Sequence, residues 1–151
     1  MKQTIIAVIC FLCVSSLYIQ AQKINHPSLL YTPQRIQQVK QRMQHEPKLQ
    51  EAWGDIKRTA DEALQKKDFN RLDYLSLAYL MTDNKEYADV IKEILLKTVE
   101  AESWGDVEMM ARIPAWRSQL GMAHKSFLSA VGYDAAYNVM SSSERKKMAE
   151  G

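Results

Sequence analysis

The sequence predicts an all-α protein whose helices pack as antiparallel hairpins. Apolar residues recur at helical spacing almost without a break from Ile36 to Tyr137, and this periodicity is the main sequence signal of amphipathic helices. Helix start and stop signals divide the chain into segments of ordinary helix length. Strand-like alternation bounded by turns is not seen in the sequence. Because the connections are short, neighbouring helices are expected to lie antiparallel.

Prolines set the limits of the first two helices. Thr32 can cap a helix that has Pro33 at its first position, where a missing N–H costs nothing. Glu46-Pro47 ends this helix, because proline disfavours the helical conformation at the residue before it. A second helix is expected from Pro47 to about Gln65. The apolar positions of the two helices are Ile36, Val39 and Met43, and then Leu49, Trp53, Ile56, Ala60 and Leu64.

The third and fourth helices are separated by a short polar connection, Asp83-Asn84. The third is expected from about Asn70 to Met81 and the fourth from Lys85 to about Glu102. Both carry apolar residues at helical spacing and should pack on a common core. These residues are Leu72, Leu75, Leu77, Ala78 and Tyr79 in the third helix, and Tyr87, Val90, Ile91, Ile94, Leu95 and Thr98 in the fourth.

A fifth helix is expected from about Ala115 to Met140, and a sixth from Ser142. Ser141 and Glu144 form a Ser-x-x-Glu capping box, in which each side chain accepts a hydrogen bond from an unpaired backbone N–H of the new helix. The inner face of the fifth helix mixes apolar and polar residues. The residues expected on that face are Leu120, Ala123, Phe127, Ala130, Val131, Asp134 and Tyr137.

The first 21 residues are typical of a signal peptide. Lys2 supplies a positive charge, an apolar run extends from Thr4 to Ile19, and Ala21 is a small residue at the expected cleavage position. We therefore expect a mature chain that begins at Gln22 and is periplasmic or secreted; a retained N-terminal anchor and a lipoprotein are the alternatives. Cys10 and Cys13 lie within the signal segment, so the mature chain would hold no thiol and no disulfide.

Composition excludes several classes of function for the remaining 130 residues. The formal charge falls from +2 to +1, because Lys2 is the only charged residue removed. Acidic and basic residues are mixed along the chain, whereas nucleic-acid binding would call for a clustered basic stripe. The three histidines, His26, His45 and His124, are dispersed and form no pair at metal-ligand spacing. We therefore expect no metal, no cofactor, no nucleic-acid partner and no membrane span after cleavage.

Two segments carry a resemblance to a known family. The later segment contains Trp116-Arg117, then Gly132-Tyr133-Asp134 followed by Tyr137, and finally Met140-Ser141 with Glu144-Arg145. The earlier one is His26-Pro27-Ser28-Leu29-Leu30-Tyr31-Thr32-Pro33. Both resemble the N-terminal helical part of the heparinase II/III-like and alginate-lyase-like polysaccharide lyases.

This resemblance implies the architecture and the activity of a longer enzyme. Members of these families build an (α/α) toroid from many helix pairs, followed by a β-sandwich domain. They cleave uronate-containing acidic polysaccharides by β-elimination. Residues 22–151 would then be the N-terminal portion of an incomplete, apparently truncated toroid. Its partners would be an acidic polysaccharide, similar to heparin, heparan sulfate or alginate, and the missing C-terminal part of the same enzyme.

The resemblance implies no catalytic residue within this chain. The conserved Asn-His pair and the catalytic Tyr of these lyases lie downstream of the matched region. Asn25-His26 has the same letters, but it lies at the mature N-terminus, outside the toroid, and the role is not carried over. The chain alone is therefore expected to be inactive. Tyr133 and Asp134 are interpreted mainly as packing residues of the toroid's inner layer.

Four residues are candidates for substrate binding: Arg117, Trp116, Trp104 and His124. Arg117 can hold a carboxylate bidentately, and Arg112 is a weaker candidate for the same role; an ion pair of either arginine with Asp106 or Glu108 is the alternative.

The indole rings of Trp104 and Trp116 offer flat apolar platforms for a sugar ring and flank the longest irregular segment. Packing in the core is the competing role of an indole, and it is favoured for Trp53. For His124 the alternative is a buried, hydrogen-bonded histidine.

Three functions remain open from the sequence. The first is the exported N-terminal part of a polysaccharide lyase, which forms one wall of a groove for an acidic polysaccharide. The second is a non-catalytic helical module that binds carbohydrate or another partner. The third is a glycoside hydrolase on the same toroid architecture.

Overall fold

The computed structural model describes residues 24–101, 104, 111–114 and 120–150. This part of the chain forms six α-helices and two short 3₁₀ turns, and it contains no strand. The all-α prediction is therefore confirmed. In order, the elements are α2 (Pro33–Met43), α3 (Pro47–Lys66), η1 (Phe69–Arg71), α4 (Leu72–Thr82), α5 (Lys85–Val99), α7 (Leu120–Ala136), η2 (Tyr137–Val139) and α8 (Ser142–Glu150).

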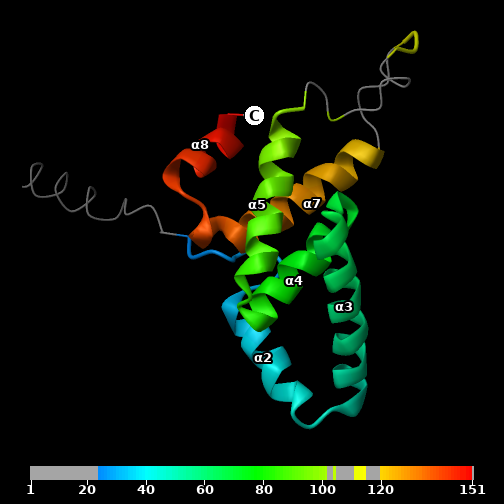
Figure 1. Ribbon diagram of the computed structural model, residues 1–151, viewed down its shortest axis with the longest axis vertical. Helices are drawn as coiled ribbons and strands as arrows, with labels where there is room; N and C mark the ends of the chain where they lie inside the picture. Colours follow the sequence, from blue (N-terminus) through cyan, green and yellow to red (C-terminus); the bar gives the residue numbers. More distant parts are fainter. Residues whose placement is uncertain (1–23, 102–103, 105–110, 115–119, 151) are drawn as a thin grey trace, which may run out of the picture.

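Helix α4 lies at the centre of the helical packing (Figure 1). It contacts α3, α5 and α7, and its residues Leu72, Leu75 and Ala78 are fully buried. A helix that is apolar on most of its circumference is expected to be covered by neighbours on several sides. The rest of the core comes from α3, α5 and α7, with Ala60, Ala63, Tyr87, Ile91, Leu95 and Leu128 among its buried members.

The predicted helix boundaries follow local capping rules. Thr32 Oγ1 accepts a hydrogen bond from Arg35 N at 3.3 Å, and Pro33 is the first residue of α2. Asn84 caps α5 by accepting from Glu86 N at 3.1 Å. The preceding residue, Asp83, ends α4 with a left-handed backbone at φ 58°. Asx side chains tolerate that region better than most residues do, so this two-residue connection can reverse the chain.

The predicted capping box before α8 is present. Glu144 N donates to Ser141 Oγ at 3.2 Å, and Ser141 N donates to Glu144 Oε2 at 2.6 Å. Helix α8 then returns along α5, where Lys147 forms an ion pair with Glu100. Met148 packs against the core from the same helix.

Several expected boundaries were wrong. The third helix is preceded by the 3₁₀ turn η1, and the fourth ends at Val99 rather than near Glu102. The fifth ends at Ala136 and is followed by the 3₁₀ turn η2, while its expected start at 115–119 lies outside the described residues. The terminal turns of helices are the least strongly held, because their last carbonyls have no intrahelical partner.

The expected inner face of the fifth helix was also wrong in its N-terminal half. Leu120 is 92% exposed and Phe127 is 52% exposed, and Ala123 and Ala130 are exposed as well. The buried stripe lies further round α7 and consists of Leu128, Ser129, Val131, Gly132, Ala135 and Ala136; Asp134 is buried as well.

The reason lies in how closely α7 approaches its neighbours. A Cβ atom added to Gly132 would lie 3.2 Å from Leu72 Cδ2 and 3.5 Å from Ile91 Cγ2. The small residues of this stripe therefore let α7 pack against both α4 and α5, which the Leu120–Phe127 stripe could not do at the same separation.

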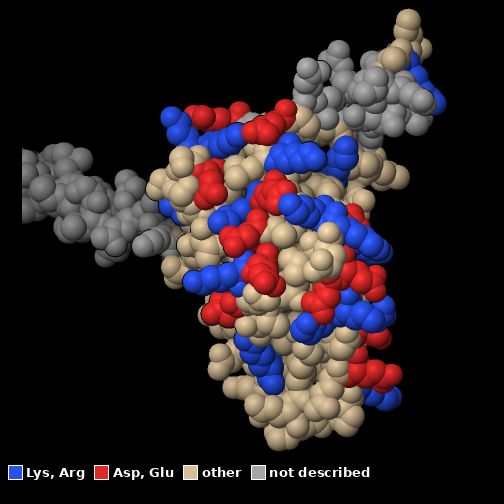
Figure 2. All heavy atoms as spheres, viewed as in Figure 1, with Lys and Arg blue, Asp and Glu red and all other residues tan. Residues whose placement is uncertain are grey.

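Charged side chains of both signs are interspersed on the face shown in Figure 2. Many of them pair along one helix, as Arg42 does with Glu46 and Lys57 with Asp61. Among the described residues, no helix is long and apolar enough to cross a membrane.

Candidate functional site

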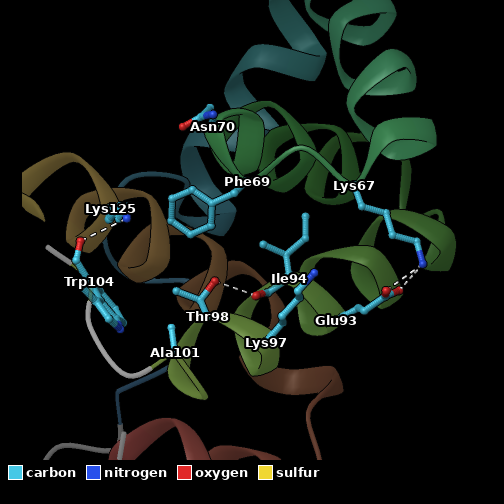
Figure 3. Close-up of a pocket in the computed structure, with 10 residues that line it drawn as sticks. All are labelled: Lys67, Phe69, Asn70, Glu93, Ile94, Lys97, Thr98, Ala101, Trp104 and Lys125. Carbon is cyan, nitrogen blue, oxygen red and sulfur yellow. Dashed lines mark hydrogen bonds and ion pairs between the residues drawn. The ribbon is translucent and has the colours of Figure 1, made fainter. Parts of the chain in front are cut away.

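A pocket of about 460 Å³ lies between the C-terminal half of α5, the turn η1 and the part of α7 that carries Lys125 (Figure 3). We call it the α5–α7 pocket. It brings together residues from four separate segments of the chain. Its described lining consists of Lys67, Phe69, Asn70, Glu93, Ile94, Lys97, Thr98, Ala101, Trp104 and Lys125.

Helix α5 supplies the longest side of the pocket. Ile94, Lys97, Thr98 and Ala101 follow one another at intervals of three, one and three residues, which places them on one side of the helix and its end. Ile94 is buried and forms an apolar base. The Thr98 hydroxyl donates to Ile94 O at 2.8 Å and so remains able to accept a hydrogen bond from a ligand.

Positive charge prevails in the described lining, which holds three lysines and one carboxylate. Lys67 Nζ lies 2.7 Å from Glu93 Oε2, so these two charges neutralise each other. Lys125 Nζ donates to Trp104 O at 3.1 Å, a neutral acceptor that leaves the charge uncompensated. Lys97 makes no hydrogen bond or ion pair with the described part of the chain. Two ammonium groups are therefore left for an anion.

Two aromatic side chains face the same space. Phe69 projects from η1 between Lys125 and Ile94, and Trp104 lies beside Lys125 at the other side of the pocket (Figure 3). Trp104 is half-buried, so part of the indole is accessible. Apolar ring faces next to hydrogen-bonding groups form the usual surface of a sugar-binding pocket, because a pyranose presents C–H groups on its faces and hydroxyls at its edge.

The structure places the sequence-predicted site residues in different ways. Trp104 lines the α5–α7 pocket. Trp116 and Arg117 lie outside the described residues, together with Asp106 and Glu108. His124 is exposed on α7 and does not belong to the described lining, so the alternative of a buried histidine was wrong. Trp53 packs partly buried against the core, as favoured from its helical stripe.

Sequence reasoning missed the lysines of the pocket. Lys67, Lys97 and Lys125 come from the end of α3, from α5 and from α7, and each has the sequence surroundings of an ordinary solvated lysine. The single usable signal was the position of Lys125 next to the candidate His124. Only the packing of both α3 and α7 against α5 brings the three lysines to one pocket.

A second cluster of polar groups surrounds Asp134 of α7. This side chain is 4% exposed and accepts hydrogen bonds from Ser28 N and Leu29 N, both at 2.8 Å to Oδ2. His26 Nδ1 lies 2.6 Å from Oδ1, and Ser28 Oγ donates to the same atom at 3.3 Å. One carboxylate thus holds the N-terminal loop, residues 24–32, against α7.

These contacts also determine the ionisation of Asp134. Burial opposes the charged form and is the largest single effect, but the hydrogen bonds from Leu29 N–H, His26 and Ser28 N–H together outweigh it. The pKa of the Asp134 carboxyl therefore lies below its ordinary value of 3.8. Two or more hydrogen bonds to a carboxylate are the usual cause of such a shift.

His26 is held on its remaining sides by the turn η2, which follows α7. Its ring stacks on Tyr137 with centroids 3.9 Å apart and an interplanar angle of 25°. Asn138 Nδ2 donates to His26 O at 2.7 Å. His26 is thus fixed by Asp134 of α7 and by Tyr137 and Asn138 of η2. Asp134 is buried, and its role here is to hold the N-terminal loop.

Among the described residues, no group of three or more His, Cys, Asp or Glu side chains is placed to hold a metal ion. Comparison with family models, with curated proteins and with solved structures gave no match for this chain.

Proposed function

We propose that this helical unit binds an acidic polysaccharide in the α5–α7 pocket, as part of a lyase that cleaves uronate-containing glycans by β-elimination. The observation that carries the binding proposal is the combination of Lys97 and Lys125 with Phe69 and Trp104 around one cavity. The lysines supply charge for an anionic group, and the aromatic rings supply apolar surface for the sugar to which that group is attached.

The size of the pocket fits a short stretch of a glycan chain. Its volume of about 460 Å³ falls within the ordinary range for small-molecule pockets, roughly 300–1,000 Å³. A sugar unit seated there would have Lys125 and the indole of Trp104 on one side and Lys97 on the other (Figure 3). Asn70 and the Lys67–Glu93 pair would face the hydroxyls, since their groups both donate and accept hydrogen bonds.

The lyase part of the proposal rests on the resemblance and on one feature of the fold. The two segments that carry the resemblance are far apart in the sequence, and they meet in space through Asp134, which binds Ser28 and Leu29. If this chain had the same architecture as the lyases that it resembles, its two motif segments would be expected to contact each other in this way. An (α/α) toroid extended by further helix pairs is therefore the architecture that we propose.

Within the described lining, the pocket supplies only part of a lyase mechanism. β-Elimination needs a base for the proton α to the carboxylate, a proton donor for the leaving oxygen and a group that neutralises the carboxylate. Lys97 and Lys125 suit the last role, whereas the described lining includes no histidine or tyrosine. We therefore expect binding without turnover, and no unsaturated uronate product when the purified protein is incubated with heparin, heparan sulfate or alginate.

A glycoside hydrolase is less well supported. Such enzymes use two carboxyl groups placed on either side of the scissile bond. Glu93 is the single carboxylate of the described lining, and it is paired with Lys67.

Calorimetric titration with defined acidic oligosaccharides tests the binding proposal. Lys97→Ala is expected to weaken binding about tenfold or more, because it removes an ammonium group that has no other described role. Trp104→Ala should weaken binding of acidic and neutral oligosaccharides alike, since it removes the stacking surface. Lys48→Ala is the matched control, because Lys48 is exposed at the far end of α3.

Wild-type protein that binds no acidic oligosaccharide, or a Lys97→Ala variant that binds as tightly as the Lys48→Ala control, would contradict the proposal. Turnover of any of the glycans by this chain would instead place an active site within these helices.

A further inference from the structure

The N-terminal half of α7 carries an apolar face that no described part of the chain covers. We call it the α7 stripe, and it consists of Leu120, Ala123, Phe127 and Ala130. Leu120 is 92% and Phe127 is 52% exposed, and both alanines are exposed. The N-terminal turns of α7 extend past α5 (Figure 1).

The charged residues of α7 leave this face free of charge. The helix contains two of them, Lys125 and Asp134. Lys125 points into the α5–α7 pocket, on the side of the helix away from the stripe. Asp134 lies on the stripe's own line, one turn after Ala130, and is covered there by Ser28 and Leu29 of the N-terminal loop. Leu29 is itself 58% exposed.

The spacing of the stripe indicates what can cover it. Its residues are separated by three, four and three positions, which is the a/d pattern of a helix that packs along another helix. Large and small side chains alternate along it: Leu, Ala, Phe, Ala. A complementary partner must present small residues opposite Leu120 and Phe127, and large ones opposite the alanines.

A second copy of the same helix meets this requirement when it runs antiparallel. Leu120 of one copy then lies opposite Ala130 of the other, and Ala123 lies opposite Phe127. All four layers pair a large residue with a small one, so the two helix axes can stay at an even distance. A parallel pair would instead set Phe127 against Phe127 and alanine against alanine, which leaves layers of unequal width.

We propose that the α7 stripe is the contact surface of an antiparallel homodimer of this chain. An interface of this kind uses the same patch on both copies and closes on itself, so assembly stops at two. The stripe is about three turns long and smaller than a standard interface of roughly 800 Å² per partner, so the dimer is weak, with dissociation in the micromolar range.

The dimer leaves the α5–α7 pocket accessible, because Lys125 lies on the opposite side of α7 from the stripe. Two pockets would then be carried by one assembly, and a polymeric glycan could bind both of them at once. The dimer itself does not depend on glycan binding.

Sedimentation velocity of the purified protein over a range of micromolar concentrations tests the proposal. The measurement needs a reductant, because Cys10 and Cys13 could otherwise link two chains. We expect a concentration-dependent monomer–dimer equilibrium. Phe127→Asp should weaken it at least about tenfold, because the carboxylate would be desolvated against an apolar helix. Its circular dichroism should stay unchanged, since Phe127 is half exposed in the monomer.

Two further variants show whether the layers are paired as proposed. Val139→Asp places the same charge on another exposed apolar residue away from the stripe and should leave the dimer intact. Ala123→Phe alone should weaken the dimer by overpacking, and the combined exchange Ala123→Phe with Phe127→Ala should restore it, because each layer again joins one large and one small residue.

A wild-type protein that stays monomeric throughout would overturn the proposal. So would a dimer that survives Phe127→Asp, since association would then be located elsewhere, for instance in the N-terminal apolar segment.

Discussion

Asp134 connects two parts of the chain that lie 106 residues apart in sequence. Its carboxylate is almost completely buried, and it accepts hydrogen bonds from two backbone N–H groups and from the side chains of His26 and Ser28. A buried carboxylate is stable only when it is paired and hydrogen-bonded on several sides. The N-terminal loop therefore has a fixed position on α7 although little of it is buried.

Asp134→Asn is expected to lower the free energy of unfolding by about 2–4 kcal/mol, because it removes charge-assisted hydrogen bonds and turns an amide N–H₂ toward other donors. Urea denaturation measures the change. Asp55→Asn is the matched control, since Asp55 is 73% exposed, and its effect should stay within about 0.5 kcal/mol. Equal stability of the two variants would contradict the role assigned to Asp134.

Acid should weaken the same contact. The pKa of Asp134 in the folded protein is lower than its ordinary value of 3.8, so the unfolded state binds the proton more readily. The stabilisation is complete above that ordinary value and is lost as the pH falls through the lowered pKa. Wild-type stability measured from about pH 5 to about pH 2 should therefore fall more steeply than that of Asp134→Asn. Parallel curves would argue against this linkage.

At the scale of the elements, the orientation of α7 is the feature that positions the pocket. Its buried stripe is rich in small residues and brings the helix close to α4 and α5. Lys125 consequently points toward the end of α5, and the Leu120–Ala130 face is left outside. The orientation of α7 about its own axis thus determines both which residues line the pocket and which apolar stripe is exposed.

Gly132→Val tests this close packing. A Cβ atom at Gly132 would lie 3.2 Å from Leu72 Cδ2 and 3.6 Å from Leu95 Cδ2, and the two methyl groups of valine add further overlap. We expect a loss of about 1–3 kcal/mol in thermal or urea unfolding.

Gly54→Ala is the helical control for that substitution. A Cβ atom at Gly54 would meet nothing within 4 Å, and alanine favours the helix, so a gain of about 0.5–1 kcal/mol is expected. A Gly132→Val variant as stable as the wild type would mean that α7 can move away from α4 without cost.

At the scale of the whole molecule, the helices around α4 form a core that depends on apolar packing and local caps. Ion pairs such as Arg58–Glu62 and Lys146–Glu150 join well-exposed side chains and add little stability. The described helices cover neither the α5–α7 pocket nor the α7 stripe, and these are the two surfaces that we propose for binding.

Export remains a prediction for the whole chain. The positive Lys2 and the apolar run to Ile19 predict cleavage after Ala21. Mass spectrometry of material from the periplasm or medium should identify a protein that begins at Gln22. A charged substitution within the run, Ile9→Asp, should retain the precursor in the cytoplasm, whereas Ser28→Ala should not. Recovery of intact Met1 protein as the stable cytoplasmic form would contradict the prediction.

The sequence by itself determined the fold class and most helix starts. Thr32, Asn84 and the Ser141–Glu144 pair act within one turn of their own helix, so their effect does not depend on distant residues. Pro47 disfavours helix at the residue before it and is the first residue of α3, and this effect is equally local. Trp104 was a candidate because it flanks the irregular segment; it lines the pocket, and its contact with a ligand stays a prediction.

Only the tertiary structure decided which side of α7 is buried and which lysines meet. Two apolar stripes run along that helix, and hydrophobic periodicity cannot choose between them, because the choice depends on how near α4 and α5 can come. Lys67, Lys97 and Lys125 likewise reach one pocket only because α3 and α7 both pack against α5. Asp134 and Ser28 likewise meet only when α7 and the N-terminal loop pack together, since a hydrogen bond across more than a hundred residues leaves no periodic trace in the sequence.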